Sequence, residues 1–183
     1  KKLKKYKYDK FRILEIGAWE GASTAAFINY FPNSEVFCID KNFRFKFKSK
    51  RITFNYCNIN NVTDLKKLST KLYKKEFKII IDDASHILTD MVRSLKFFIN
   101  YLEKGGIFII EDFNAPVYFK DLNDSDGKEI LMEDILDNLK SKNKFKSSIL
   151  TNIDQEFLFE NISEIEKFKG KTNISDIAFL RKK

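Results

Sequence analysis

The sequence predicts an α/β fold with three layers, in which helices cover both faces of a mostly parallel sheet. Short apolar runs alternate with amphipathic segments over the first two thirds of the chain, a pattern typical of consecutive strand–helix–strand units. Hydrophobic residues make up 43% of the 183 residues, and a chain of this length can bury about 70% of its unfolded surface in one domain. No internal repeat is evident, so we expect a single domain over residues 1–183.

The first strand–helix–strand unit contains a glycine turn. The apolar run Ile13–Ile16 predicts a strand, and Val36–Ile39 predicts the next one. Between them, the segment from about Ser23 to Tyr30 predicts a helix, which ends before Pro32 because proline cannot continue a helix. Such units are right-handed and bind ligands outside the carboxyl ends of their strands.

Strands and helices continue to alternate up to residue 110. Apolar residues recur with helical spacing from Val62 to Tyr73 and from Leu88 to Leu102, and Gly105 and Gly106 are expected to stop the second of these helices. The expected strands of this part are, in order, Ile52–Tyr56, the largely apolar run Phe77–Ile81, and Ile107–Ile110. Apolar runs of this kind are typical of parallel strands that are buried on both faces.

The last third of the chain is expected to complete the sheet. A helix is predicted over Glu129–Leu139. Two segments, Phe157–Phe159 and Ile162–Phe168, compete for the sixth strand, and the sequence leaves this choice open. Ser175–Leu180 predicts the final strand, which pairs antiparallel with the sixth across Gly170. We therefore expect seven strands, mostly parallel, with an antiparallel C-terminal strand.

The glycine turn after the first strand indicates a nucleoside site. Gly17 and Gly21 allow a tight turn and a close approach to a ligand, because neither carries a Cβ atom. Asp40 follows the second strand, about 20 residues past the first glycine, where an acid can bind ribose hydroxyls. A dinucleotide turn would carry a third glycine, and Glu15 at the strand tip would repel a pyrophosphate but suits the positive end of a ligand.

This order of residues resembles the first motif of the Rossmann-like S-adenosylmethionine-dependent methyltransferases. The resemblance implies that the glycine turn faces the amino acid part of the cofactor and that Asp40 binds the ribose. In that family an acidic or amide residue after the third strand meets the adenine ring. The nearest candidate is Asn58, where the family usually has Asp, and Asp82 at the end of the fourth strand is included in the expected cofactor site.

Carboxylates also follow the fourth and fifth strands. Asp82 or Asp83 should lie close to Glu111 and Asp112, since these two strands are expected to be neighbours. Converging carboxylates repel one another unless a cation joins them, and Mg²⁺ or Mn²⁺ prefers such oxygen ligands. The alternative is that these acids cap helices, and we favour the metal. Histidine side chains can take up a proton near neutral pH. The only histidine, His86, is either a catalytic base or a residue without a catalytic role.

Two stretches, IIIDDASH at residues 79–86 and GGIFIIEDF at 105–113, resemble the metal-dependent O-methyltransferases that modify sugar hydroxyls, notably the macrolide-sugar group and its cephalosporin-biosynthesis relatives. The resemblance implies that Asp83, Glu111 and Asp112 bind Mg²⁺ or Mn²⁺ and that His86 acts as the base. It also implies S-adenosyl-L-methionine as methyl donor and a small-molecule sugar as acceptor. Two alternatives remain open: an RNA or protein methyltransferase, and a non-catalytic Rossmann-like partner subunit.

The formal charge of +8 comes mainly from lysine, with 29 Lys and 5 Arg against 26 acids. Recognition of nucleic acids favours the forked guanidinium group of arginine, so we favour a solvated lysine surface over a nucleic-acid partner. The segment Phe43–Lys48 alternates aromatic and basic residues. It is either an edge strand or loop protected by lysines, which we favour, or a surface that stacks on nucleic-acid bases.

The remaining features concern compartment and assembly. Cys38 and Cys57 lie in or beside expected strands, so we expect buried, reduced thiols. The chain has no apolar signal segment near its start and no run of 18 apolar residues, which favours a cytoplasmic protein that does not insert into a membrane. The sequence begins at Lys1, close to the first strand, and we expect that an N-terminal segment covering the substrate is missing. A homo-oligomer is one of the assembly states that the sequence leaves open.

Overall fold

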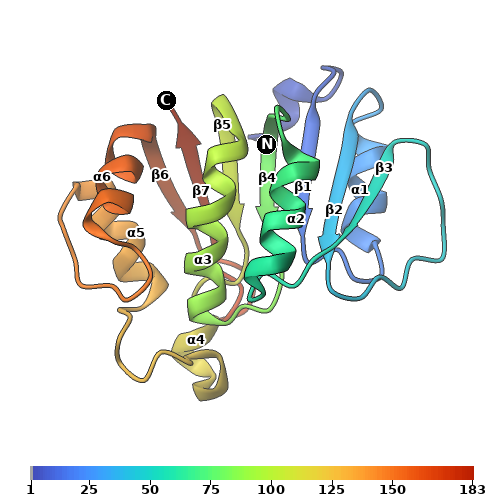
Figure 1. Cartoon of the computed structure of the whole chain (residues 1–183). Helices are drawn as coiled ribbons and strands as arrows, with labels where there is room; N and C mark the ends of the chain where they lie inside the picture. Colours follow the sequence, from blue (N-terminus) through green and yellow to red (C-terminus); the bar gives the residue numbers. More distant parts are fainter. Residues whose placement is uncertain (1) are drawn as a thin grey trace.

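The computed structural model describes residues 2–183, which form one seven-stranded sheet with helices on both faces (Figure 1). The strands are β1 (Arg12–Ile16), β2 (Glu35–Asp40), β3 (Ile52–Tyr56), β4 (Phe77–Asp82), β5 (Leu102–Ile110), β6 (Ile162–Phe168) and β7 (Ile177–Lys182). Their order in the sheet is β3-β2-β1-β4-β5-β7-β6. The first five strands pair in parallel, whereas β7 pairs antiparallel with both β5 and β6. The predicted sheet is therefore confirmed.

The helices are α1 (Ala22–Tyr30), α2 (Val62–Leu72), α3 (Leu88–Phe98), α4 (Ala115–Tyr118), α5 (Met132–Ser141) and α6 (Asn152–Asn161). Short 3₁₀ turns occur at Lys4–Tyr6, Ile99–Tyr101 and Lys120–Leu122. In Figure 1, α2 and α3 lie in front of the sheet and α1 lies behind it. Within residues 2–183, no helix has both the length and the apolar character needed to cross a bilayer.

The sheet is buried on both faces, which explains why its strands are largely apolar. Successive residues of a strand point to opposite faces, so Ile80 packs in the core under α2 and α3 while Ile79 packs in the core under α1. Leu14 and Ile13 divide between the same two cores in the adjacent strand β1. Both cysteines are buried free thiols, as expected.

Strand β5 begins earlier than predicted. The helix that was expected to reach Leu102 ends at Phe98, and the strand starts at Leu102 instead of Ile107. The pairing between β4 and β5 shifts register after Phe77, so residues 103–106 bulge, and Gly105 adopts a φ of +68° there. The glycine pair thus bends a strand and does not stop a helix.

The C-terminal third resolves the choice that the sequence left open. Phe157–Phe159 lie inside α6, whose first turn is held by a capping box between Thr151 and Asp154, and Ile162–Phe168 form strand β6. The preceding helix α5 starts at Met132, three residues later than expected. Its start is displaced because the buried carboxylate of Glu129 accepts hydrogen bonds from residues 147–149 and so belongs to a tertiary contact.

Residues 41–51 form a loop along the β3 edge of the sheet, with no helix or strand of their own. Phe43 and Phe45 pack edge-on against Phe54, with ring centroids 5.1 and 4.8 Å apart. The lysines and the arginine between the phenylalanines are exposed. The alternation of aromatic and basic residues therefore marks a loop with phenylalanines packed inward and cations outward.

Candidate active site

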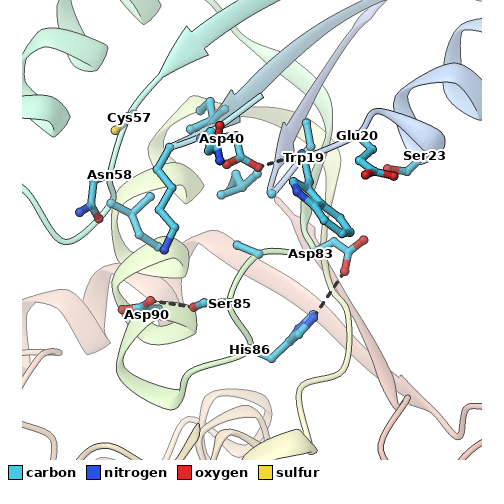
Figure 2. A pocket seen from close by; sticks show the side chains of 18 of the residues that line it. Trp19, Glu20, Ser23, Asp40, Cys57, Asn58, Asp83, Ser85, His86 and Asp90 are labelled. Carbon is cyan, nitrogen blue, oxygen red and sulfur yellow. Dashed lines mark hydrogen bonds and ion pairs between the residues drawn. The ribbon is translucent and has the colours of Figure 1, made fainter. Parts of the chain in front are cut away.

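A cavity of about 590 Å³ opens at the carboxyl ends of β1, β2 and β4 (Figure 2). Its walls come from the turn after β1, the end of β2, the turn between β3 and α2, and the loop between β4 and α3. The chain reverses its direction of travel across the sheet between β1 and β4, and ligands of open α/β sheets bind at such a switch point. The volume is within the range of small-molecule and cofactor sites, about 300–1,000 Å³.

Gly17 is required by the protein's own backbone. Its φ is +89°, and its N–H donates to the carbonyl of Ile39 at 2.9 Å. A Cβ atom at this position would stand 2.1 Å from the carbonyl oxygen of Asp83, so the loop after β4 can approach only a glycine. The sequence analysis assigned the close approach at Gly17 to a ligand, and in the structure the loop that carries Asp83 approaches this residue closely.

Gly21 starts helix α1 in a left-handed conformation, with φ of +82°. The ring of Phe45 packs over it, and a Cβ atom here would lie 2.6 Å from that ring. The N–H of Arg44 also donates to the carbonyl of Trp19 at 2.9 Å. The loop of residues 41–51 therefore holds the glycine turn from outside.

Asp40 stands at the cavity wall with both carboxylate oxygens aligned by backbone groups. The N–H of Trp19 donates to Oδ2 and the N–H of Asn42 donates to Oδ1, each at 2.8 Å. A carboxylate oxygen has two lone pairs, so each retains one acceptor position. The arrangement suits a vicinal diol such as that of a ribose.

Glu15 does not line the cavity. Its side chain is fully buried beneath the glycine turn and accepts hydrogen bonds from the hydroxyls of Ser23 and Thr24 in the first turn of α1. Burial raises the pKa of Glu15. As placed, this carboxylate anchors the start of the helix to strand β1, and its role in cofactor binding stays a prediction.

Of the two remaining residues of the expected cofactor site, Asn58 lines the cavity and Asp82 does not. Asn58 lines the cavity and is exposed, and its Oδ1 accepts the N–H of Asn60 at 3.0 Å. Asp82 is buried behind the wall and does not line the cavity. Its Oδ2 has no hydrogen-bond partner among residues 2–183, and burial raises the pKa of Asp82 to about 7. Cofactor binding by both residues stays a prediction.

Asp83, Glu111 and Asp112 follow the neighbouring strands β4 and β5 and lie near enough for their charges to interact, and their role as metal ligands stays a prediction. Burial raises the pKa of Asp83 to about 6, and the charge of Asp112 raises it further. Burial likewise raises the pKa of Glu111 to about 7, with added repulsion from Asp83 and Asp112. Within residues 2–183, however, no three acidic, histidine or cysteine side chains are close enough together, as they stand, to hold a metal ion.

His86 lies between two of these acids. Its Nε2 is 3.7 Å from Oδ1 of Asp83 and 3.9 Å from Oδ2 of Asp112 (Figure 2 shows the first of these pairs). Its Nδ1 is buried with no hydrogen-bond partner in the described part of the chain. Both His86 and Asp112 have positive φ, +55° and +51°, conformations that non-glycine residues adopt at a cost and that cluster at functional sites.

The loop after β5 is fixed by the C-terminal hairpin. Asn114 Nδ2 donates to the carbonyl of Asn173 at 2.6 Å, and the N–H of Asp176 donates to Asn114 Oδ1 at 3.1 Å. The N–H of Phe113, next to Asp112, donates to the carbonyl of Asp176 at 3.2 Å. The position of Asp112 therefore depends on residues some sixty positions later in the chain.

Sequence reasoning missed several residues that line the cavity, among them Trp19 and Asp90. Trp19 stands between the two glycines with 55% of its surface exposed and a φ of +34°. Asp90 lines the cavity from the first turn of α3 and is buried. An acid in a first helical turn is usually a partner of the helix dipole, so nothing in its spacing distinguishes it.

Comparison with known proteins adds sequence and fold relatives. No protein-family model matches the chain. It is 26% identical over 114 residues to mycinamicin VI 2''-O-methyltransferase of Micromonospora griseorubida, which covers 58% of this chain and 28% of that protein. It is 27% identical over 116 residues to demethylmacrocin O-methyltransferase of Streptomyces fradiae, which covers 60% of this chain and 29% of that protein. The chain thus spans less than a third of the length of these curated relatives.

Solved structures share the whole fold. The MycE methyltransferase from the mycinamycin biosynthetic pathway, in complex with Mg, SAH and mycinamycin VI, superposes with a TM-score of 0.75 at 20% identity, covering 99% of this chain and 47% of that one. A putative ribosomal RNA methyltransferase from Plasmodium falciparum gives a TM-score of 0.56 at 18% identity, over 97% of this chain and 87% of that one. The chain therefore has the Rossmann-like fold of S-adenosylmethionine-dependent methyltransferases, and the curated proteins it resembles in sequence are O-methyltransferases.

Proposed function

We propose that this chain is the catalytic domain of an S-adenosylmethionine-dependent O-methyltransferase that acts, with a divalent cation, on a hydroxyl of a sugar or sugar-containing small molecule. The observation that carries the proposal is the meeting of two groups of residues at one cavity. His86 and Asp83 form one wall, and the glycine turn with Asp40 forms another. The sugar-modifying curated relatives support the acceptor class.

The cofactor would lie along the glycine turn. Asp40 would accept hydrogen bonds from the two ribose hydroxyls, since both of its oxygens are already aligned by backbone donors. S-adenosylmethionine, when bound, supplies an electrophilic methyl group. The work of the chain is then to hold an acceptor hydroxyl in line behind that methyl, and such positioning contributes roughly 7–11 kcal/mol to lowering a barrier.

The acid cluster fits a divalent cation in its chemistry. Asp83, Glu111 and Asp112 offer the hard oxygen ligands that Mg²⁺ and Mn²⁺ prefer. The raised pKa values of Asp83 and Glu111 reflect mutual repulsion in addition to burial, and a cation would relieve that repulsion. When bound there, the cation supplies positive charge that lowers the pKa of a nearby hydroxyl.

His86 would remove the proton of the acceptor hydroxyl. The proton would pass to Nε2, the ring nitrogen that faces the carboxylates of Asp83 and Asp112. The imidazolium that results is stabilised by the carboxylates of Asp83 and Asp112, 3.7 and 3.9 Å away. The two acids would thus orient the base and balance its charge.

A methyl-transfer screen tests the proposal. The protein is incubated with methyl-labelled S-adenosylmethionine and a panel of nucleotide sugars and free glycosides, after chelation and again with added Mg²⁺ or Mn²⁺. We expect labelled sugar only with the metal present. Glu111→Gln should lose activity. Its matched control is Glu166→Gln, which removes a carboxylate from strand β6 and should retain activity. Transfer to RNA but to no sugar would refute the acceptor class, and full activity in chelator would refute the metal.

A further inference from the structure

Asp90 is a buried carboxylate at the cavity wall whose role the proposed mechanism does not use. It is 5% exposed, in the first turn of α3. The hydroxyl of Ser85 donates to its Oδ2 at 2.7 Å, and Nη1 of Arg93 lies 3.4 Å from its Oδ1. The same guanidinium nitrogen donates to Oδ1 of Asn60 at 2.9 Å, so Arg93 joins the two elements that close this end of the cavity.

The location of Asp90 identifies the part of the cofactor that it would face. This step rests on the proposed function, because it assumes that the cavity holds S-adenosylmethionine. Asp40 marks the ribose, and His86 with Asp83 marks the end where the methyl group reacts. In Figure 2, Asn58, Ser85 and Asp90 lie at one end of the cavity, and Glu20 and Ser23 lie at the other. The adenine ring therefore belongs at the end that contains Asp90.

The chemistry of a carboxylate selects one edge of the adenine ring. An ionised carboxylate only accepts hydrogen bonds. The ring nitrogens of adenine on its open edges are acceptors, and its 6-amino group is the donor. Ser85 holds one carboxylate oxygen and Arg93 provides the counter-charge, so the buried charge is compensated while acceptor positions remain.

Asn58, the residue expected from the sequence to meet adenine, is less suited to this role. It is exposed, and its Oδ1 already accepts the N–H of Asn60. We propose that Asp90, oriented by Ser85, recognises the 6-amino group of adenine and makes the site selective for adenosyl over 6-oxopurine cofactors.

The test compares S-adenosylhomocysteine with S-inosylhomocysteine, which carries an oxygen in place of the 6-amino group. We expect the wild-type protein to bind the adenosyl compound at least tenfold more tightly, because a 6-oxo group faces the carboxylate with an acceptor. Asp90→Asn keeps the size of the side chain and adds a donor, so the preference should fall at least tenfold. Dissociation constants are measured by calorimetry, which needs no catalytic activity.

Three further variants separate this role from a structural one. Asp134→Asn, an exposed acid in the first turn of α5 that does not line the cavity, is the matched control and should leave the ratio of the two dissociation constants within about twofold. Ser85→Ala should weaken binding of the adenosyl compound while its melting temperature stays close to that of the wild-type protein. An unchanged ratio in Asp90→Asn, or a larger change of the ratio in Asn58→Ala than in Asp90→Asn, overturns the assignment while the methyltransferase proposal stands. If the wild-type protein binds neither compound, both proposals fail.

Discussion

The carbonyl oxygen of Asp83 fills the space in which a Cβ atom on Gly17 would stand, 2.1 Å away. The N–H of Asp83 also donates to the carbonyl of Ile16 at 3.0 Å. The turn that would hold the cofactor and the loop that carries His86 are thus in direct backbone contact. In the proposed mechanism, the distance between the methyl donor and His86 would therefore be determined by the main chain, which is less free to adapt than side chains are.

Gly17→Ala should therefore destabilise the fold more than a positive φ alone would. Alanine in the left-handed region costs about 1–2 kcal/mol, and here the clash with Asp83 adds to it. Gly127→Ala is the matched control, since Gly127 has φ of +73° and nothing within 4 Å of an added Cβ. Urea unfolding should show the larger loss of free energy for Gly17→Ala. Equal losses in the two variants would mean that the loop between β4 and α3 moves away from the added Cβ atom without a further loss of stability.

Asp40→Ala should weaken binding of S-adenosylhomocysteine. Loss of charge-assisted hydrogen bonds to the ribose is expected to cost about 1.5–3 kcal/mol, or roughly 10- to 150-fold in affinity. Asp9→Ala, an exposed acid before β1 that does not line the cavity, should bind as the wild-type protein does. Calorimetry measures both. Tighter binding of NAD than of S-adenosylhomocysteine by the wild-type protein would contradict the cofactor assignment itself.

His86→Ala should lower kcat by about 10²- to 10⁴-fold at pH 7, the usual contribution of a positioned general base. Affinity for S-adenosylhomocysteine should barely change, because the histidine belongs to the acceptor side. The variant should recover part of its activity at high pH, where hydroxide removes the proton. A loss of less than threefold at pH 7 would exclude His86 as the base.

Asp82→Asn should change how stability depends on pH. The folded-state pKa of Asp82 is raised to about 7, above the unfolded value of about 3.9, so the native state binds more protons between these values. Its contribution to stability is complete below pH 4 and is lost as the pH rises towards 7. The free energy of unfolding of the wild-type protein should thus fall between pH 5 and pH 8.

The amide in Asp82→Asn carries no charge at either pH, so the variant should lose less stability over this range than the wild-type protein. Asp83 and Glu111 contribute in the same direction and remain in the variant, so a smaller dependence should persist. Urea unfolding in chelator at both pH values provides the measurement. A variant with the full wild-type dependence would show that Asp82 is not the group that titrates.

The sequence was sufficient where a local pattern determines the structure. The glycine turn, Asp40 and the acids that end β4 and β5 follow from the rule that parallel strands present their carboxyl ends at one edge. It was insufficient where contacts between residues far apart in the sequence determine the structure. Glu129 lies outside α5 because it accepts hydrogen bonds from residues 147–149, and Gly105 lies in a bulge that results from the pairing with β4. No local pattern records either contact.

The candidate site shows the same division. The convergence of acids could be anticipated from the strand order. The burial of Glu15 beneath the turn could not, because it depends on hydrogen bonds from the hydroxyls of Ser23 and Thr24 in the first turn of α1. Asp90 could not be found because an acid in a first helical turn has an ordinary explanation. Its burial and its contacts with Ser85 and Arg93 exist only in the folded chain.

The anchoring of the β5 loop by Asn114 and Asp176 has a consequence for synthesis on the ribosome. The five parallel strands are complete once residue 110 has emerged, and domains generally begin to fold from the N-terminal side. The groups that hold the loop next to Asp112, the carbonyl of Asn173 and the N–H of Asp176, are synthesised about sixty residues later. A nascent chain could therefore form the glycine turn and place Asp40 well before it could order the loop that carries Asp112.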